Sequence, residues 1–215
     1  MQQNFATLHH LPYNTIRNQA AAFPPKRQTT MDATLLKIIT ECQRGNMAAQ
    51  RALFEHYKTR LFAVCLRYAR DRPEAEDMLQ DAFLAIFRDL GQYKGDGVFD
   101  GWLHRITVRA SLRSLRRKNP LRFAENYTEL PGDSMHVQPD SELMSESILQ
   151  LVQQLPTGYR TIFNMHCVEA WSYTEIAQEL GISESSVRSQ YSRACKQLRD
   201  MVERLFKYEV LGMKY

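Results

Sequence analysis

Six side chains that can donate hydrogen bonds recur along one predicted helix near the C-terminus. They are Ser185, Arg188, Ser189, Ser192, Arg193 and Lys196. The apolar residues of the same helix, Val187, Tyr191, Ala194 and Leu198, follow helical spacing, so they are expected to face a core and leave the donors on the opposite side. Side chains of these types contact phosphates and base edges, and an α-helix fits the major groove of DNA. This helix is therefore a candidate DNA reader.

The residues just before this helix predict how it is held. Ser172 and Glu175 have the spacing of a capping box, which predicts that a helix starts at Tyr173 and runs to Leu180. Gly181 permits a left-handed turn, and Ser183 can cap a following helix over about 184–205. Two such helices form a helix-turn-helix. The alternative is a solvated face on an ordinary helix pair, but the cap, the turn glycine and the donors together favour DNA binding.

A second basic surface is predicted between residues 101 and 124, a stretch with seven basic residues and no acid. Five of its arginines fall within one helical sector of roughly 120°, which also contains Trp102. They are Arg105, Arg109, Arg113, Arg116 and Arg117. A one-sided basic stripe suits a nucleic-acid backbone, and the aromatic ring suits an unpaired base. The alternative, a basic helix facing water, is nearly as well supported by this stripe alone.

A third candidate is the polar face of the helix expected from Glu74 to Leu90. Residues predicted to share this face are Asp77, Gln80, Asp81, Ala85 and Arg88. Residues predicted to pack inward are Met78, Leu79, Ala82, Phe83 and Ile86. Taken alone, the pattern favours a solvated face, because charges at i and i+4 are common on helix surfaces.

The spacing of apolar residues is helical throughout, and no β-alternation persists. We therefore predict an all-α fold in which a flexible linker joins two small helical domains, the C-terminal one a helix-turn-helix. The first domain, residues 31–118, has helices expected over about 32–44, 48–70, 74–90 and 102–118, with a loop or tight corner at the glycine-rich stretch up to Gly101. The linker spans residues 119–141 and the second domain residues 142–206, which begins with helices over 143–155 and 159–167. Residues 1–30 are expected to be a disordered tail or upstream extension, and residues 207–215 a C-terminal tail.

Several classes of protein are excluded by composition. The longest apolar run, Leu61–Leu66, has six residues, far fewer than the roughly 20 of a membrane span, and no signal peptide is evident. Four widely spaced cysteines and the scattered histidines predict no metal site and no cofactor. No motif for nucleophilic or phosphate chemistry is present. We expect a cytoplasmic protein that is not an enzyme and has no membrane contact of its own.

The net charge of +4 looks small, but it is unevenly distributed. The seven bases of residues 101–124 exceed the total, and residues 125–150 hold six acids and no Lys or Arg. Two basic surfaces separated by an acidic linker suit a divided DNA reader.

The order of these pieces resembles the sigma factors of bacterial RNA polymerase, in particular the small extracytoplasmic-function group. The segments that carry the resemblance are Glu76–Phe83, Phe99–Ile106, the basic helix, and Leu155-Pro156 before the helix-turn-helix. It covers about residues 32–205. Residues 31–118 then correspond to sigma region 2 and residues 142–206 to sigma region 4.

The resemblance implies roles for these residues. Asp77, Gln80, Asp81 and Phe83 would dock on core RNA polymerase. Phe99, Trp102 and the five arginines would open and read the −10 promoter element, and the six donors of the last helix would read the −35 element. The implied partners are core RNA polymerase and promoter DNA, with an anti-sigma factor as a further partner that many relatives have. The alternative is a helix-turn-helix regulator that binds DNA without polymerase.

Overall fold

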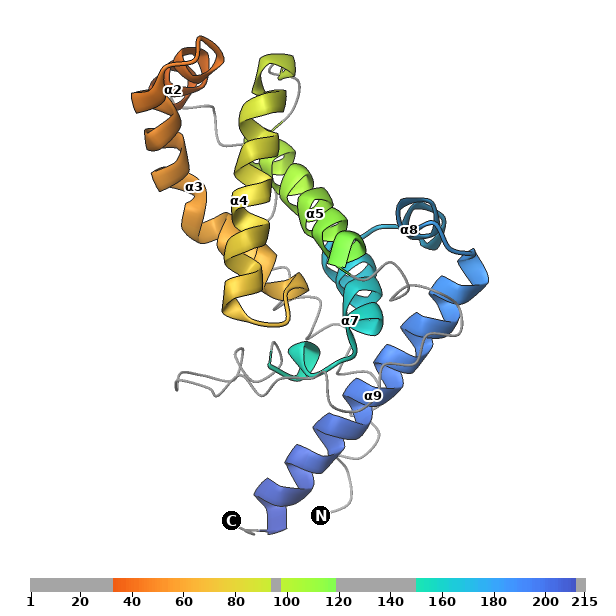
Figure 1. The fold of residues 1–215 in the computed structure, drawn as a ribbon. Coiled ribbons are helices and arrows are strands. Elements are labelled where there is room, and N and C mark those ends of the chain that lie inside the picture. Colours follow the sequence, from red (N-terminus) through yellow and green to blue (C-terminus); the bar gives the residue numbers. More distant parts are fainter. Residues whose placement is uncertain (1–32, 94–97, 119–149, 212–215) are drawn as a thin grey trace. The chain divides into compact units, whose positions relative to one another are not determined.

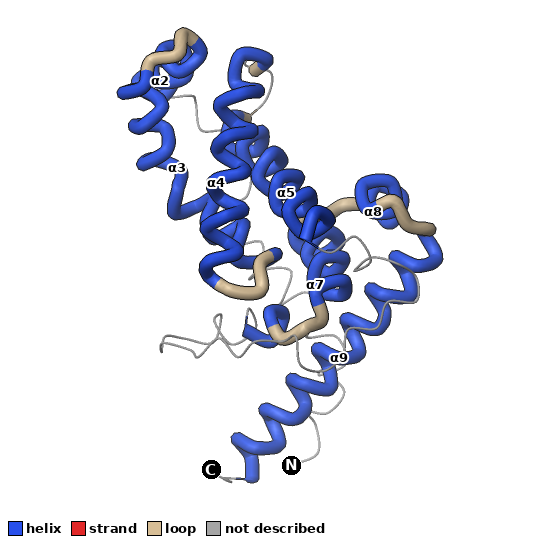
Figure 2. Tube along the Cα trace, in the orientation of Figure 1, coloured by secondary structure: helices blue, strands red, loops and turns tan. Residues whose placement is uncertain are grey.

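The computed structural model describes residues 33–93, 98–118 and 150–211. These residues fall into two compact units, one within residues 26–120 and one that includes residues 121–215. Their regular structure is helical, with no strand in the described ranges (Figure 2). The predicted all-α fold is confirmed.

The N-terminal unit is a helical bundle. In chain order it contains α2 (Ala33–Gln43), α3 (Met47–Tyr68), α4 (Arg72–Asp89), the short 3₁₀ turn η1 (Leu90–Gln92) and α5 (Phe99–Lys118). Helix α4 packs against both α3 and α5, and α3 also contacts α2 and α5 (Figure 1). The candidate polymerase-docking helix and the basic helix are therefore direct neighbours.

Capping residues set the beginnings of these helices. The Asn46 side chain accepts hydrogen bonds from the amides of Ala48 and Ala49, at 2.9 and 3.2 Å, and so begins α3. Asp71 accepts from the Glu74 amide at 2.8 Å and begins α4, with a proline in the first turn. The observed bounds of α2, α3 and α4 differ from the predicted bounds by at most two residues, because these signals are local.

The core of this unit lies where the apolar faces of the helices meet. Its buried members include Leu53, Tyr57 and Leu61 of α3, together with Ile86 of α4 and Leu103 of α5. All five are at most 2% exposed. The Gln43 side chain also donates to the Leu90 carbonyl at 3.0 Å, which ties α2 to the end of α4.

Helix α5 begins earlier than predicted. It starts at Phe99 rather than Trp102, and Gly101 lies inside its first turn, not in a loop. Asp100 supplies the reason: its carboxylate accepts from the Tyr57 hydroxyl at 2.8 Å and pairs with Arg60 at 3.2 Å. An acid in the first turn also stabilises a helix N-terminus. These bonds to α3 offset the cost of a glycine within a helix.

The C-terminal unit is likewise helical in its described part. Residues 150–153 are helical, and α7 (Thr157–Phe163) continues into a wide π-helical turn, η3 (Asn164–Val168). Then come α8 (Tyr173–Leu180) and α9 (Glu184–Leu211). The predicted helix over 143–155 lies mostly outside the described residues, and its described end stops two residues early. Buried Leu155, Phe163, Ala194 and Leu198 bring α7 and α9 together in this core.

Helix α9 is longer than expected, since it continues to Leu211 rather than ending near Leu205. No glycine or proline interrupts residues 199–211, so nothing in the local sequence ends the helix before Leu211. The predicted N-terminal tail and linker lie outside the described residues, as does the end of the predicted C-terminal tail.

Candidate nucleic-acid and polymerase interfaces

The helix-turn-helix has the predicted local geometry. The Glu175 amide donates to Ser172 Oγ at 3.2 Å, and the Glu175 carboxylate accepts from the Ser172 amide at 2.8 Å, which completes the capping box. Gly181 ends α8 with φ +70° and ψ 36°, and its amide donates to the Ala177 carbonyl at 2.9 Å. Ser183 Oγ then accepts from the Ser186 amide at 3.1 Å and begins α9. The observed bounds of α8 are the predicted ones.

Helix α9 divides into an inner and an outer face as its spacing predicts. Val187, Ala194 and Leu198 are buried, and Tyr191 is half-buried. The six predicted donors are all exposed: Ser185, Arg188, Ser189, Ser192, Arg193 and Lys196. The placement of these side chains on one accessible face is what a groove-reading helix requires.

One of these donors is already held within the unit. The Arg188 guanidinium pairs with the Glu184 carboxylate one turn earlier and lies over the Tyr173 ring, 4.9 Å from its centroid. Thr174 donates to the same carboxylate at 2.9 Å, and these two bonds, Arg188 first, lower the pKa of Glu184. Tyr173 and Glu184 thus orient Arg188 from two sides. Sequence reasoning did not assign either residue, although Glu184 and Arg188 have the i, i+4 spacing of a helical ion pair.

The basic stripe of α5 is present in the structure. Arg105, Arg109, Arg113 and Arg117 are exposed, and Arg116 is half-buried. Beneath the stripe, Leu103, Val108 and Leu112 are buried at 1% exposure or less. The exposed arginines recur every four residues, so they form one line of positive charge along the helix.

The aromatic corner at the start of α5 is packed rather than open. Phe99 is 4% exposed and stacks on Trp102, with ring centroids 5.7 Å apart and planes inclined by 18°. Tyr93 contacts both rings, at 5.0 Å from Phe99 and 5.3 Å from Trp102. Trp102 is half-buried, so part of its ring is accessible while Phe99 supports it from below. Phe99 belongs to the core and has no exposed face for a base.

The face of α4 differs from the predicted polar face at two positions, Ala85 and Leu84, while Phe83 packs inward as its spacing predicted. Phe83 is 4% exposed and packs against Phe54, with ring centroids 4.7 Å apart, so its placement gives it a supporting role. Ala85 is 3% exposed and faces α5. Leu84 is 69% exposed and lies seven residues after Asp77, two helical turns along the same face. Sequence reasoning missed Leu84, although this spacing could have found it.

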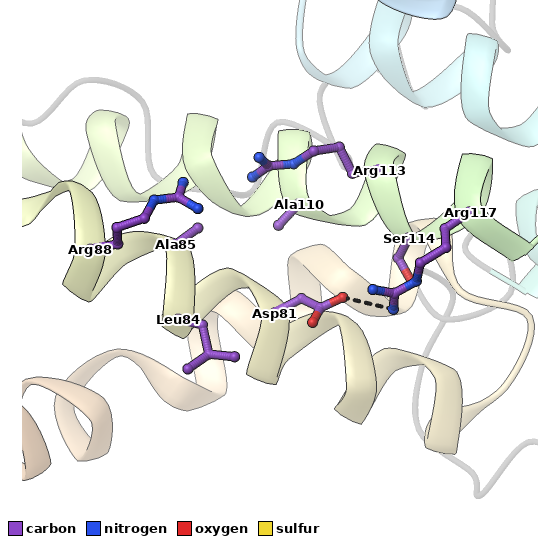
Figure 3. A pocket seen from close by; sticks show the side chains of 8 residues that line it. All are labelled: Asp81, Leu84, Ala85, Arg88, Ala110, Arg113, Ser114 and Arg117. Atoms are coloured by element: carbon purple, nitrogen blue, oxygen red, sulfur yellow. Dashed lines mark hydrogen bonds and ion pairs between the residues drawn. The ribbon is translucent and has the colours of Figure 1, made fainter.

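A groove of 440 Å³ runs between α4 and α5. It is lined by Asp81, Leu84, Ala85, Arg88, Ala110, Arg113, Ser114 and Arg117 (Figure 3). Asp81, predicted to bind polymerase, pairs at 3.2 Å with Arg117, predicted to bind DNA. Arg88 is held by Asp89 in a two-bond fork, at 2.7 and 3.0 Å, which is the first cause of the lowered pKa of Asp89. The structure thus joins residues from two surfaces that the sequence analysis treated separately.

A part-buried polar contact involves another side of α5. The Arg67 guanidinium donates to His104 Nε2 at 3.3 Å. Burial, with added repulsion from Arg67 and Arg60, lowers the pKa of His104 to about 4. The ring is therefore neutral at pH 7 and can accept this hydrogen bond.

The cysteines show no metal-binding or redox arrangement. All four are free thiols, and burial raises the pKa of Cys42 and Cys195 and takes that of Cys65 to about 12. Thiols with such pKa values are protonated and packed at pH 7. Within the described ranges, no group of three or more His, Cys, Asp or Glu side chains could hold a metal ion. Nor does any described helix have the length and apolar character to cross a membrane.

Comparison with known proteins accounts for both units. The profile of Sigma-70 region 2 matches residues 53–120, and that of Sigma-70 region 4 matches residues 145–198. RNA polymerase sigma-H factor of Pseudomonas aeruginosa is 30% identical over 172 residues, which cover 74% of this chain and 88% of that protein. The ECF RNA polymerase sigma factor SigE of Mycolicibacterium smegmatis is 31% identical over 165 residues, covering 73% of this chain and 63% of SigE. This chain is an extracytoplasmic-function sigma factor.

The matched ranges show which sigma region contains each structural feature of this sigma factor. The region 2 match contains α4, the aromatic corner and the basic stripe, and the region 4 match contains the helix-turn-helix. Sigma factors, the family to which both matched regions belong, are not enzymes. Two solved structures are also similar. The structure of CnrH in complex with the cytosolic domain of CnrY has 20% sequence identity and a TM-score of 0.42, and the match covers 78% of this chain and 96% of that chain. The structure of the sigma factor RpoE in complex with the anti-sigma factor NepR from Bartonella quintana has 18% identity and a TM-score of 0.44, and the match covers 71% of this chain and 96% of that chain.

Proposed function

We propose that this sigma factor binds core RNA polymerase through the exposed face of α4 and directs it to promoters with two separate DNA-binding surfaces. The observation that carries the proposal is that one chain contains both the basic helix α5, within the region 2 match, and a helix-turn-helix with exposed hydrogen-bond donors, within the region 4 match. The protein acts by binding energy alone, catalyses no step itself, and works in the cytoplasm with the polymerase.

The N-terminal unit is proposed to dock on polymerase and to bind the −10 element. Asp77, Gln80 and Leu84 present charge, a hydrogen-bonding amide and an apolar anchor on one face of α4. The arginines of α5 supply contacts to backbone phosphates. Trp102, supported by buried Phe99, offers part of a ring on which an unpaired base can stack.

The C-terminal unit is proposed to bind the −35 element as a duplex. Ser185, Ser189 and Arg193 project from the N-terminal half of α9, which is the part of a recognition helix that reaches base edges. Arg188 is fixed in orientation by Tyr173 and Glu184, so less conformational freedom is lost when it binds.

Each surface alone is small, and the function depends on their use together. Two modules joined in one chain and on one polymerase bind at high effective concentration, so the combined affinity exceeds that of either. An anti-sigma factor remains a prediction of the family resemblance.

Run-off transcription tests the function directly. Purified core polymerase is incubated with genomic DNA fragments, with and without this protein, and the 5′ ends of the transcripts are mapped. New start sites that depend on the protein are expected to share sequences near −10 and −35. Stable binding of the protein to a duplex operator without polymerase, together with no protein-dependent start site, would instead establish the alternative regulator.

Substitutions test the separate surfaces. Gln80→Ala with Leu84→Ala is expected to weaken binding to core polymerase and to leave the helical circular dichroism unchanged, because both side chains are exposed. Arg193→Ala is expected to reduce transcription from −35-dependent promoters. Arg204→Ala is the matched control, since it removes an exposed arginine of the same helix about 16 Å further along. Equal effects of the two arginine substitutions would show that the recognition face is misplaced.

A further inference from the structure

The ion pair between Asp81 and Arg117 joins the two interfaces of the N-terminal unit. Asp81 comes from α4 and Arg117 from the last turns of α5, 36 residues later in the chain. Small side chains allow the two helices to approach closely here, because Ala85, Ala110 and Ser114 line the groove between them and are buried. Figure 3 shows the Arg117 guanidinium turned back across this groove toward the Asp81 carboxylate.

Both side chains remain accessible while they are paired. The Arg117 side chain is 68% exposed and that of Asp81 is 35% exposed. An exposed ion pair is worth about 0.2–1 kcal/mol, so a competing partner can open it. Within the proposed function each residue has such a partner: polymerase for Asp81 and a DNA phosphate for Arg117.

We propose that the Asp81–Arg117 ion pair couples polymerase docking to DNA binding. This inference rests on the proposed function. In the free sigma factor Asp81 holds Arg117 away from DNA. When polymerase binds Asp81, the Arg117 guanidinium is released and can bind a DNA backbone phosphate on the α5 side of the groove. The groove is therefore a surface that the two ligands share, and not part of either interface alone.

Thermodynamic linkage makes the coupling reciprocal. A ligand that takes Arg117 from the pair releases Asp81 for the other ligand, so each ligand strengthens the binding of the other by the same factor. The strength of an exposed ion pair sets this factor at about 1.5- to 5-fold. The coupling is thus a modest bias toward DNA binding by the holoenzyme and against DNA binding by the free protein.

The first test measures DNA binding by the full-length protein without polymerase. The probe is a fluorescent single-stranded oligonucleotide of mixed sequence, titrated at several salt concentrations. Asp81→Asn is expected to raise the affinity about 1.5- to 5-fold and to steepen the salt dependence by about 0.7 in the log–log slope, as one more phosphate contact forms. When Arg117 is already replaced by Gln, Asp81→Asn should raise the DNA affinity by no more than the control substitution described in the next paragraph.

Glu76→Gln is the matched control for this measurement. Glu76 lies on the same helix and pairs with exposed Arg72 at 3.1 Å, so its substitution changes the net charge equally and breaks a similar ion pair. Arg72 lies outside the basic stripe and the groove. An equal gain in DNA affinity for Asp81→Asn and Glu76→Gln would reduce the effect to general electrostatics and overturn the proposal.

The second test measures the binding of core polymerase. Arg117→Gln frees the Asp81 carboxylate and is expected to tighten polymerase binding about 1.5- to 5-fold, although it removes a DNA contact. Arg51→Gln, which removes an exposed arginine of α3 outside the stripe and the groove, should leave polymerase binding unchanged. Unchanged or weaker binding by Arg117→Gln overturns the coupling. Failure of the wild-type protein to bind polymerase would instead refute the proposed function, and the DNA measurement would still decide whether Asp81 masks Arg117.

Discussion

Gly181 and Gly101 offer a pair of identical substitutions whose effects should have opposite signs. Gly181 forms the turn of the helix-turn-helix at φ +70°, in the left-handed region. Gly101 lies in the first turn of α5 with helical neighbours. A Cβ atom added at either position meets no atom within 4 Å, so steric clash contributes to neither substitution. Only the backbone preferences of alanine remain.

These preferences set the expected magnitudes. Alanine in the left-handed region destabilises the folded state by about 1–2 kcal/mol. Alanine also restricts the unfolded chain more than glycine does, which stabilises the folded state by about 0.4–1 kcal/mol. Gly181→Ala should therefore destabilise the C-terminal unit by about 1 kcal/mol. Alanine in a helix is favoured over glycine by up to about 1 kcal/mol, so Gly101→Ala should stabilise the N-terminal unit.

Hydrogen exchange followed by mass spectrometry is the suitable assay, because two units can open separately and a single melting temperature would mix them. A change of 1 kcal/mol alters an opening equilibrium about fivefold. Peptides from α8 and α9 should exchange about fivefold faster in Gly181→Ala, with the N-terminal unit unchanged. Peptides from α5 should exchange more slowly in Gly101→Ala. If Gly181→Ala slows exchange in α8 and α9, the turn is not left-handed and the helix-turn-helix geometry is wrong.

Three further substitutions have defined outcomes. Ser172→Ala removes the acceptor for the Glu175 amide and should destabilise α8 by about 1 kcal/mol, measured by the same exchange experiment; no change would mean that the cap is not formed. Tyr57→Phe removes the 2.8 Å hydrogen bond to Asp100 and should lower the free energy of unfolding of the N-terminal unit by about 0.5–1.5 kcal/mol in urea, with the start of α5 most affected. The folded pKa of His104, about 4, lies below the unfolded value of about 6.5, so its contribution to stability is full above pH 6.5 and falls as the pH drops toward 4. Between pH 7 and pH 5, the free energy of unfolding of the wild-type protein should fall by about 2 kcal/mol more than that of His104→Asn. Equal decreases in the two proteins would place the His104 ring in contact with water.

The sequence predicted the C-terminal DNA reader closely because its signals are local. Ser172, Glu175 and Gly181 lie within ten residues, and each acts on its own backbone or on a neighbouring amide. The donors of α9 are exposed for a similar reason, since one helical period fixes which residues lie opposite Val187 and Ala194. Helix propensity and capping need no information from distant parts of the chain.

The aromatic corner and the α4 face were predicted less well because packing decides them. Phe83 and Phe99 fit the family's interface segments, but the core of the N-terminal unit takes both rings. The start of α5 depends on Asp100 meeting Tyr57 and Arg60, which lie 43 and 40 residues earlier in the chain. No periodicity within α5 carries that information.

By itself, then, the sequence determined a helical protein with a basic stripe, a polar helix and a helix-turn-helix in the order of a sigma factor. Periodicity, caps and charge are properties of short segments, so they can be recognised before folding is considered. Only the tertiary structure decided that Ala85 is buried, that Phe99 supports Trp102, and that Asp81 meets Arg117. These outcomes depend on which faces of α3, α4 and α5 pack together, and that choice is made by buried side chains tens of residues apart.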